Sequence, residues 1–407
     1  MYNVSSSFIY RASAHNAAWR RKFTLGTSDY SNHVMGWPAV SRSWDSISPT
    51  SVTINLSNND RTFNFFLTDG TKLHASAAVQ MGLIQDNYVV DGYVVDGYVL
   101  QSDVVSGDYI DVIAGTIDSL QFANNQCAAT VIDKFKTLTT KIVGDTTSPA
   151  SYTGSSYLVH DLAWYVCTSH GGLSALTSTS NPDIDYASFS SWTSVFSADN
   201  VRMKAQFTGQ QPSDILKRIA AMTQSAIWIE SNRVKFVRFT VAGESSLTFD
   251  DSITIDGSQV MDERSLVNKF YVGAAYDTTS RTYGITVNDS NSSSISRYGL
   301  KEKTSNEALI WYVDSGSALN LAQRMVLTGK EIFPRLQINT PLTGIHLTIG
   351  DTLTISDTHL QSSDNYRVMS ETLDMENGKK SFTVDQTQFL SGFTLDVSAL
   401  DSSEVLT

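Results

Sequence analysis

The side chains that most often carry out enzyme chemistry are present in this chain, but their spacing does not assemble a known type of active site. The seven histidines are scattered, and the patterns HExxH, GxSxG, CxxC, GxGxxG and GxxxxGK[ST] do not occur in the sequence. His160 and Asp161 could supply half of a catalytic triad. On a helix, however, neighbouring side chains point about 100° apart, so these two do not share a face. We therefore expect no enzymatic activity, no cofactor and no metal.

Two polar clusters that resemble ligand sites have simpler structural explanations. Asp183 and Asp185 could bind Ca²⁺, but the order of ligands found in an EF-hand loop is missing around them. Asp185 instead precedes a helix-like stretch and is predicted to cap it. Residues 170–172, which include two glycines, could form a phosphate nest, yet the carboxyl end of a helix has the wrong dipole for an anion. We expect a helix to stop there.

The basic residues also favour a structural interpretation over nucleic-acid binding. Arg233, Lys235 and Arg238 alternate with apolar residues, which is typical of the solvent-facing side of a strand. The chain has 29 basic and 41 acidic residues, a net charge of −12. A protein that coats nucleic acid would need the opposite balance.

The length and the cysteine content limit which class of protein this chain can belong to. At 407 residues the chain can bury several cores and should contain about two to four domains. Cys127 and Cys167 define no disulfide framework and are expected to be two separate thiols. Arg11 and the basic cluster at 20–22 interrupt any signal peptide, and no run of about 18 apolar residues could span a membrane. We expect the protein to fold in a cytoplasm.

A mixed α/β module is predicted for residues 146–240. Phe189, Trp192 and Phe196 fall on one side of a short helix and are interpreted as core residues. Pro212 suits the first turn of the next helix, where its missing N–H group is not needed. A β-hairpin is expected at 226–237, and the first helix of the module is expected to be capped by Ser155 or Ser156.

The remaining segments are predicted to be rich in β-strands, which makes the fold mainly β with an α+β insert. Short strands separated by turn signals at intervals of about ten residues indicate a barrel or a sandwich at 1–145. These strands include 51–56, 62–66, 72–74, 109–117 and 127–132, and a strand is also expected at 346–355. The expected domains are 1–145, 146–240, 241–330 with a helix near 317–327, 331–395, and an acidic tail at 396–407.

A tandem repeat, Tyr-Val-Val-Asp-Gly twice over, occupies residues 88–97. Asp-Gly pairs favour the tight turns of hairpins, and two copies are too few to stack into a solenoid. We expect a protruding hairpin that serves a protein interface, because its apolar strand would be costly to expose. The candidate interface residues are Tyr93, Val94, Val95 and Tyr98.

The order of several weak motifs resembles the hub, or tail-tip, proteins of tailed bacteriophages and of phage-derived gene-transfer particles. The motifs are Met-Gly-Trp at 35–37, Gly-Thr-Ile at 115–117, the helical segments at 171–173, 184–192 and 211–216, Asn-Lys-Phe-Tyr-Val at 268–272, Arg-Tyr-Gly at 297–299 and Leu-Thr-Ile-Gly-Asp at 347–351. The tandem repeat has no counterpart in that family.

This resemblance implies a non-enzymatic virion protein at the tail tip, assembled in the cytoplasm of a bacterial host. It implies a homotrimer in which two tube-like β-barrels per chain, at 1–145 and 331–395, build a pseudo-sixfold ring. The implied partners are the tail tube or a distal tail ring, the tape-measure protein and a tip fibre or spike. DNA would pass through without stable binding. The alternative is a receptor- or carbohydrate-binding β-protein of the tail tip.

A channel that DNA must traverse should repel phosphate, so the acidic excess is expected on the channel wall. The candidates for this wall are Asp111, Asp118 and Asp351, which fall on or beside strands of the two barrel regions.

Overall fold

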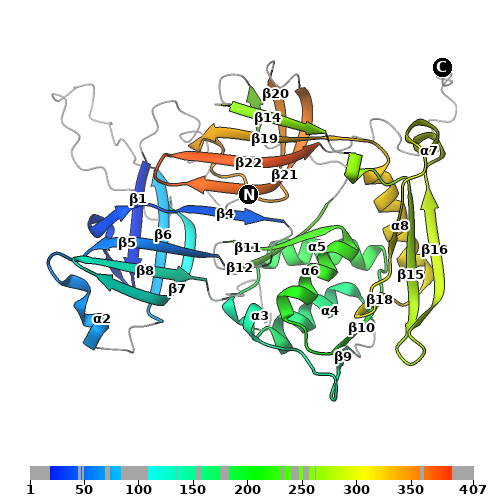
Figure 1. The fold of residues 1–407 in the computed structure, drawn as a ribbon, viewed down its shortest axis with the longest axis horizontal. Coiled ribbons are helices and arrows are strands. Elements are labelled where there is room, and N and C mark those ends of the chain that lie inside the picture. Colours follow the sequence, from blue (N-terminus) through cyan, green and yellow to red (C-terminus); the bar gives the residue numbers. More distant parts are fainter. Residues whose placement is uncertain are drawn as a thin grey trace.

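The computed structural model describes residues 19–386 apart from 45–46, 48–49, 69–73, 84–108, 134, 153–156, 175–182, 231–232, 240–246, 251–255, 262 and 358–361. Two curled β-sheets and a helical module make up this part of the chain (Figure 1). The predicted fold class is confirmed, because the protein is mainly β. Along the chain, most of its helices fall between the last strand of the N-terminal sheet and β19 (Pro334–Pro341) of the C-terminal sheet.

The N-terminal sheet has seven strands. Their order is β2 (Ser28–Asp29), β1 (Trp19–Leu25), β6 (Ser76–Leu83), β7 (Tyr109–Ala123), β8 (Gln126–Ile132), β5 (Ser51–Ser57) and β3 (Val34–Gly36). Side chains alternate between the core and the outside as expected, and Val52, Ile54 and Leu56 of β5 are buried. The register of β7 shifts once against β6 and once against β8, and such bulges curl a sheet.

The C-terminal sheet also has seven strands, and one of them comes from the N-terminal part of the chain. Its main path is β13 (Thr248–Asp250), β20 (Thr352–Asp357), β21 (Ser362–Asp374), β22 (Lys379–Gln386), β19 (Pro334–Pro341) and β14 (Asp256–Met261). The seventh strand, β4 (Ala39–Ser43), pairs antiparallel with the second half of β21. The segment before β5 therefore ties the two sheets together.

The helical module follows the local sequence signals closely. It contains α3 (Lys136–Thr140), α4 (Val159–Tyr165), α5 (Tyr186–Ala198), α6 (Pro212–Thr223) and the hairpin of β11 (Ser225–Glu230) and β12 (Arg233–Arg238). The carboxylate of Asp185 accepts the N–H of Ser188 at 2.9 Å, which confirms the predicted cap. Pro212 occupies the first turn of α6 as expected. Beyond α4, a π-helical turn ends at His170, and Gly172 follows with φ +75°, so the predicted helix stop is also confirmed.

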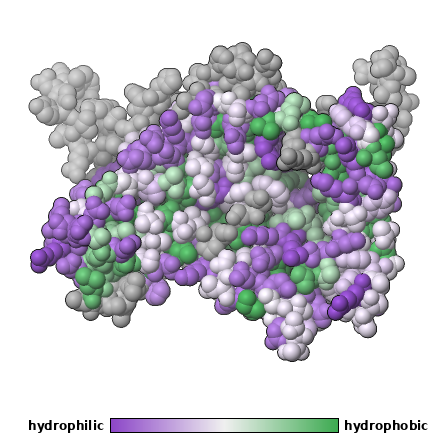
Figure 2. All heavy atoms as spheres, viewed as in Figure 1, coloured by the Kyte–Doolittle hydropathy of each residue, from purple (hydrophilic) through white to green (hydrophobic). Residues whose placement is uncertain are grey.

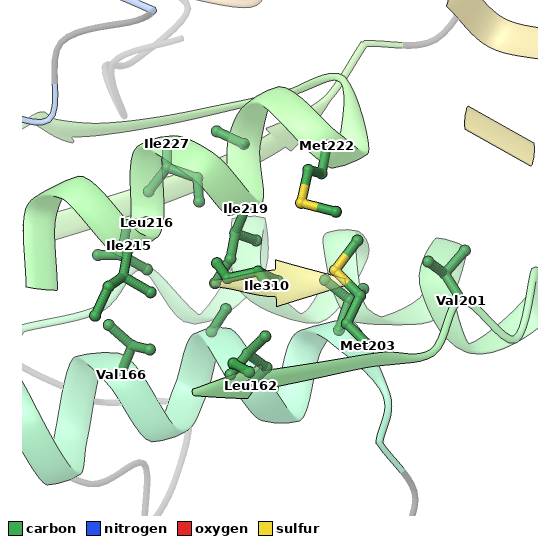
Figure 3. Packing of buried hydrophobic residues seen from close by; sticks show 14 of the residues in the cluster. Leu162, Val166, Val201, Met203, Ile215, Leu216, Ile219, Met222, Ile227 and Ile310 are labelled. Atoms are coloured by element: carbon green, nitrogen blue, oxygen red, sulfur yellow. The ribbon is translucent and has the colours of Figure 1, made fainter. Parts of the chain in front are cut away.

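The core of the module is shared with the segment that follows it. A six-stranded sheet combines β16 (Thr282–Ser290), β15 (Lys269–Asp277), β18 (Ile310–Tyr312), β10 (Met203–Phe207), β9 (Ala150–Tyr152) and β17 (Glu302–Ser305), and α7 (Ser292–Tyr298) and α8 (Ser315–Gly329) accompany it. One buried cluster includes Trp192, Phe196 and Leu321, with Phe189 packed against it. Phe189, Trp192 and Phe196 of α5 therefore belong to the core, as predicted. Figure 3 shows α4 and α6 facing each other across this apolar interior, with Leu162, Ile219 and Ile310 between them.

One expected strand is wrong, and another begins later than expected. Residues 62–66 form a 3₁₀ turn and the short helix α2 (Phe65–Thr68), because Phe63 and Phe66 are both buried at helical spacing and the Asn58 side chain accepts the N–H of Phe63 at 2.9 Å. The strand expected at 346–355 begins only at Thr352. The segment before it is a turn whose backbone carbonyls accept hydrogen bonds from the ammonium group of Lys380.

Several predictions fall outside the described residues. They are the capping serines 155 and 156, the tandem repeat with Tyr93, Val94, Val95 and Tyr98, the acidic tail at 396–407 and most of the strand expected at 72–74. Cys127 and Cys167 are both buried and free, as expected.

Candidate functional site

The outward face of the C-terminal sheet carries two rows of small polar side chains that run across five strands. Strand pairing aligns Ser41, Thr372, Ser381, Asn339 and Asp256 in the first row and Ser43, Ser370, Thr383, Gln337 and Ser258 in the second. We call this surface the polar face. The residues between the rows, such as Glu371, Ile338 and Phe382, point inward and are buried. Asp256 is the one charged residue among the ten members of the two rows.

Hydrogen bonds hold the first row together. The hydroxyl oxygens of Ser41 and Thr372 lie 2.8 Å apart, and the Ser381 hydroxyl donates to the Asn339 carbonyl at 2.5 Å. The Asn339 amide in turn donates to the carboxylate of Asp256. A hollow of about 340 Å³ lies on this face, over β14, β19, β21 and β22. Such a surface offers hydrated hydroxyl and amide groups with almost no fixed charge.

A buried ion cluster fastens β4 to the sheet behind the polar face. The guanidinium of Arg42 donates to the carboxylate of Glu371 at 3.0 Å, and the ammonium of Lys380 lies 2.7 Å from the other carboxylate oxygen. Arg42 also donates to the backbone carbonyl of Val112 in β7. Because β7 belongs to the N-terminal sheet, Arg42 bridges both sheets. The side chains of Glu371 and Lys380 are each only 1% exposed, so this cluster is well shielded from water.

A second buried carboxylate connects the hairpin of the helical module to the turn before β20. Glu230 accepts hydrogen bonds from the Trp228 indole at 3.0 Å, the Thr348 hydroxyl at 2.6 Å and the Lys235 ammonium at 3.1 Å. Burial opposes its ionisation, but Lys235, Arg42 and the Thr348 hydroxyl lower the pKa of Glu230 to about 2. Glu230 is therefore a permanent anion at this junction.

Comparison with solved structures places this architecture among tail proteins of bacteriophages. The 43 kDa tail protein of prophage MuSo2 from Shewanella oneidensis matches 91% of this chain over 99% of its own length, with a TM-score of 0.54 and 14% sequence identity. A tail protein from Neisseria meningitidis MC58 matches 91% of this chain over 97% of its own length, with a TM-score of 0.56 and 12% identity. The chain has the phage tail-protein fold. This confirms the resemblance drawn from its motifs.

The similarity is one of structure and not of close sequence. Neither the comparison with models of protein families nor the comparison with curated proteins gave a match. At identities of 12 and 14% the two tail proteins establish the fold shared with this chain, and the roles of individual residues have to be argued from its own geometry.

Of the acidic residues predicted to line a channel, two lie on β7 of the N-terminal sheet and the third lies in a turn next to the C-terminal sheet. Asp111 is on the outward side of β7 and accepts a hydrogen bond from Gln80 at 2.7 Å. Asp118 sits at a register shift of β7 and pairs with Lys136 at 2.5 Å. Asp351 lies in the turn before β20, where it accepts the N–H of Thr348 at 2.8 Å and where burial raises its pKa. None of the three belongs to the polar face.

The basic residues of β12 do not form the solvated face that we expected. Only Arg233 is exposed. Lys235 pairs with buried Glu230, and Arg238 points inward and bonds Asp199 at 2.5 Å. Arg238 is one position out of phase with the other two, so the alternation of a strand places it on the same side as Val234 and Phe236.

The structure places His160 and Asp161, the pair considered for catalysis, close together. The imidazole of His160 lies 3.7 Å from the Asp161 carboxylate, but the histidine is buried, and burial lowers its pKa. Across residues 19–386, outside the gaps given above, no group of three or more His, Cys, Asp or Glu side chains could hold a metal ion. Within the same residues, no helix is long and apolar enough to cross a membrane.

The sequence held signals for the residues that our reasoning missed. In the stretch from Lys379 to Gln386, Lys380 occupies the same phase as Phe382 and Val384, and a lysine in the buried phase of a strand requires an acidic partner. Glu371 likewise shares the buried side of its strand with Leu373. Their partner Arg42 lies 329 residues from Glu371 in the chain, which no local pattern could reveal.

Proposed function

We propose that this protein is a structural, non-enzymatic component of a phage tail: a homotrimeric hub at the distal end of the tail tube. Three copies would place six curled sheets around one axis, and this number suits a sixfold tube above and a threefold tip below. The observation that supports this most directly is that one chain holds two seven-stranded curled sheets, joined by β4, in a fold shared with phage tail proteins over nearly their full length.

The proposed hub belongs to the virion and would assemble in the cytoplasm of the bacterial host. Its partners would be the tail tube or a distal tail ring on one side and a tip fibre or spike on the other, with the tape-measure protein inside. The junction at Arg42, Glu371 and Lys380 suits this role, because buried ion pairs with several hydrogen bonds hold the two sheets in a fixed relation.

We further assign the channel wall to outward strand faces, with the polar face as the contribution of the C-terminal sheet. DNA carries one charge per ~1.7 Å of its axis, so a cationic wall would retain it by counterion release. The two rows of the polar face contain no Lys or Arg. Asp111 and Asp118 would supply the acidic part of the wall from the N-terminal sheet. Asp351 is partly buried in the turn before β20, so its negative charge would contribute to the wall only at short range.

The alternative, a receptor- or carbohydrate-binding protein, would be favoured by a large exposed aromatic patch. In the part of the chain that the structure describes, the large apolar residues that are exposed are Met35, Leu67, Ile142, Tyr186, Val260, Met261 and Leu300. One of the seven is aromatic. Figure 2 shows the apolar side chains of one face in small groups among polar ones. We therefore favour the hub.

The mass of the purified protein in solution tests this proposal. Light scattering should give three times the chain mass of 44.6 kDa, and electron cryomicroscopy should show a threefold ring with a central opening. Rings of the wild-type protein should not retain double-stranded DNA at low salt. A protein that stays monomeric, and that shows no threefold density in particles carrying it, would refute the hub.

A further inference from the structure

Strand β16 is an outermost strand of the six-stranded sheet, and β15 is the one described strand that pairs with it. Its nine residues, Thr282–Ser290, pair with β15 without a register shift and include no lysine and no proline. Lysines, prolines and bulges are the usual devices that keep a sheet edge from pairing with a further strand. The outer edge of β16 is therefore suited to accept one.

The two sides of β16 define what a further strand would have to offer. Ile285 and Val287 pack against the buried cluster of the helical module, but both are only partly buried. Thr286 and Asn288 alternate with them and are exposed. A strand placed beside β16 would therefore need apolar side chains next to the first pair and polar side chains next to the second.

The sequence that follows β22 has this pattern. Residues 387–407 lie outside the described part of the chain, and within them residues 393–399 read Phe-Thr-Leu-Asp-Val-Ser-Ala. Apolar and polar residues alternate over all seven positions, which is typical of a strand with one buried side. The segment therefore offers the apolar side and the polar side that a neighbour of β16 needs.

The connection between α8 and β19 brings the end of β22 and the end of β16 to the same part of the molecule. Arg335, near the start of β19, pairs with Asp385, one residue before β22 ends. The carbonyl of Lys330, directly after α8, accepts a hydrogen bond from the Ser294 hydroxyl of α7 at 2.5 Å. Helix α7 begins two residues after β16 ends. Figure 1 shows α7 at the end of the β15–β16 hairpin that lies toward the C-terminal sheet.

The chain is long enough to pass from β22 to β16. Residues 330–335 join the two places, and residues 387–392, also six in number, separate β22 from the alternating segment. An extended chain covers at most about 3.6 Å per residue, so either stretch can bridge ~20 Å. The alternating segment would then reach β16 at Ser290 and run toward Thr282, which is the antiparallel direction.

We propose that residues 393–399 add as an antiparallel strand to the outer edge of β16 in the same chain. Leu395 then lies beside Val287. Val397 lies beside Ile285, and both pairs extend the apolar side of the sheet. The added strand bonds the outer backbone groups of β16, so copies of the chain do not join through this edge. The pairing is independent of the hub proposed above.

A pair of cysteines tests the added strand and its register. Asp396 lies opposite Thr286 in the proposed pairing, and opposite Cα atoms of antiparallel strands are about 4.5–5.5 Å apart, within the range of a disulfide. Thr286→Cys with Asp396→Cys should therefore form a disulfide, detected by mass spectrometry of unreduced peptides. The native Cys127 and Cys167 are buried and can stay in place. The control, Thr282→Cys with Asp396→Cys, is out of register and should stay reduced.

A mixture of chains shows whether the disulfide joins residues of one chain. Chains that carry only Thr286→Cys, mixed with chains that carry only Asp396→Cys, should remain unlinked. Linked chains would show that the segment pairs with another copy and would overturn the proposal. Equal disulfide yields in the matched pair and in the out-of-register control would overturn it as well.

Hydrogen exchange provides an independent measurement, with a control in the same segment. Leu395→Lys with Val397→Lys places charges on the apolar side and should lower the protection of peptides that cover 282–290. Thr394→Lys with Ser398→Lys adds the same number of charges to the polar side and should leave this protection unchanged. Circular dichroism spectra should match the wild type for both variants. Unchanged protection in the first variant, or an equal loss in both, would overturn the added strand.

Discussion

Replacing Glu371 by glutamine should lower the free energy of unfolding more than any other equally small substitution at the junction of the two sheets. The substitution keeps the shape of the side chain but removes the anion that faces both Arg42 and Lys380. Two cations would remain in a site where the three side chains are 1–6% exposed. Removing one partner of a buried ion pair typically costs about 3–5 kcal/mol, a large part of the ~5–15 kcal/mol that stabilises a typical protein.

An exposed ion pair on the same sheet provides the matched control. Arg335 and Asp385 form two hydrogen bonds of 2.6 and 2.9 Å, but their side chains are 56% and 33% exposed. Arg335→Gln should therefore cost at most about 1 kcal/mol. A third variant, Arg42→Met with Glu371→Leu and Lys380→Met, should recover much of the loss, because apolar groups of similar volume often replace a buried ion cluster without penalty.

Urea denaturation would give the free energies of unfolding, and hydrogen exchange measured by mass spectrometry would locate the change. We expect Glu371→Gln to lower the denaturation midpoint and to reduce protection in β4, since Arg42 anchors that strand to β21 and to Val112. Equal effects of Glu371→Gln and Arg335→Gln would refute the reasoning, and so would unchanged protection of β4 in the first variant.

Three further predictions concern other parts of the molecule. Burial and Lys380 lower the pKa of His346 from 6.5 to about 4. As the pH drops from 6.5 to 4, the unfolded chain therefore takes up a proton that the folded protein does not, and the free energy of unfolding should fall by ~3 kcal/mol. His346→Leu should abolish this pH dependence in urea titrations, and an unchanged pH dependence would contradict the assignment. Trp192→Ala should lower the melting temperature by removing ~3–5 kcal/mol, whereas an unchanged melt with lost attachment to cells would indicate a ligand contact. Deleting residues 93–97 should leave the circular dichroism spectrum intact and weaken assembly, and an unfolded product would show that the repeat belongs to the core.

Local patterns in the sequence were sufficient for the elements themselves. The alternation in β5, the cap at Asp185, Pro212 at the start of α6 and the aromatic spacing of α5 all predicted what the structure contains. Each of these features depends on hydrogen bonds or burial within a few residues of the chain, so the sequence determines them almost alone. The strand expected at 62–66 failed for the same kind of reason. Phe63 and Phe65 have the spacing of a strand, but Phe63 and Phe66 have the spacing of a helical turn, and it is this second pair that is buried.

The arrangement of these elements was decided only by the tertiary structure. The sequence does not show that β4 leaves its neighbours and joins the C-terminal sheet, and without that pairing the two rows of the polar face cannot be aligned. It shows that Lys380 needs an acidic partner. It does not show that this partner is Glu371, or that Glu371 also pairs with Arg42. Strand pairing and buried charge compensation both join residues hundreds of positions apart, and their free energy depends on the fit of whole sheets, which no short window of sequence contains.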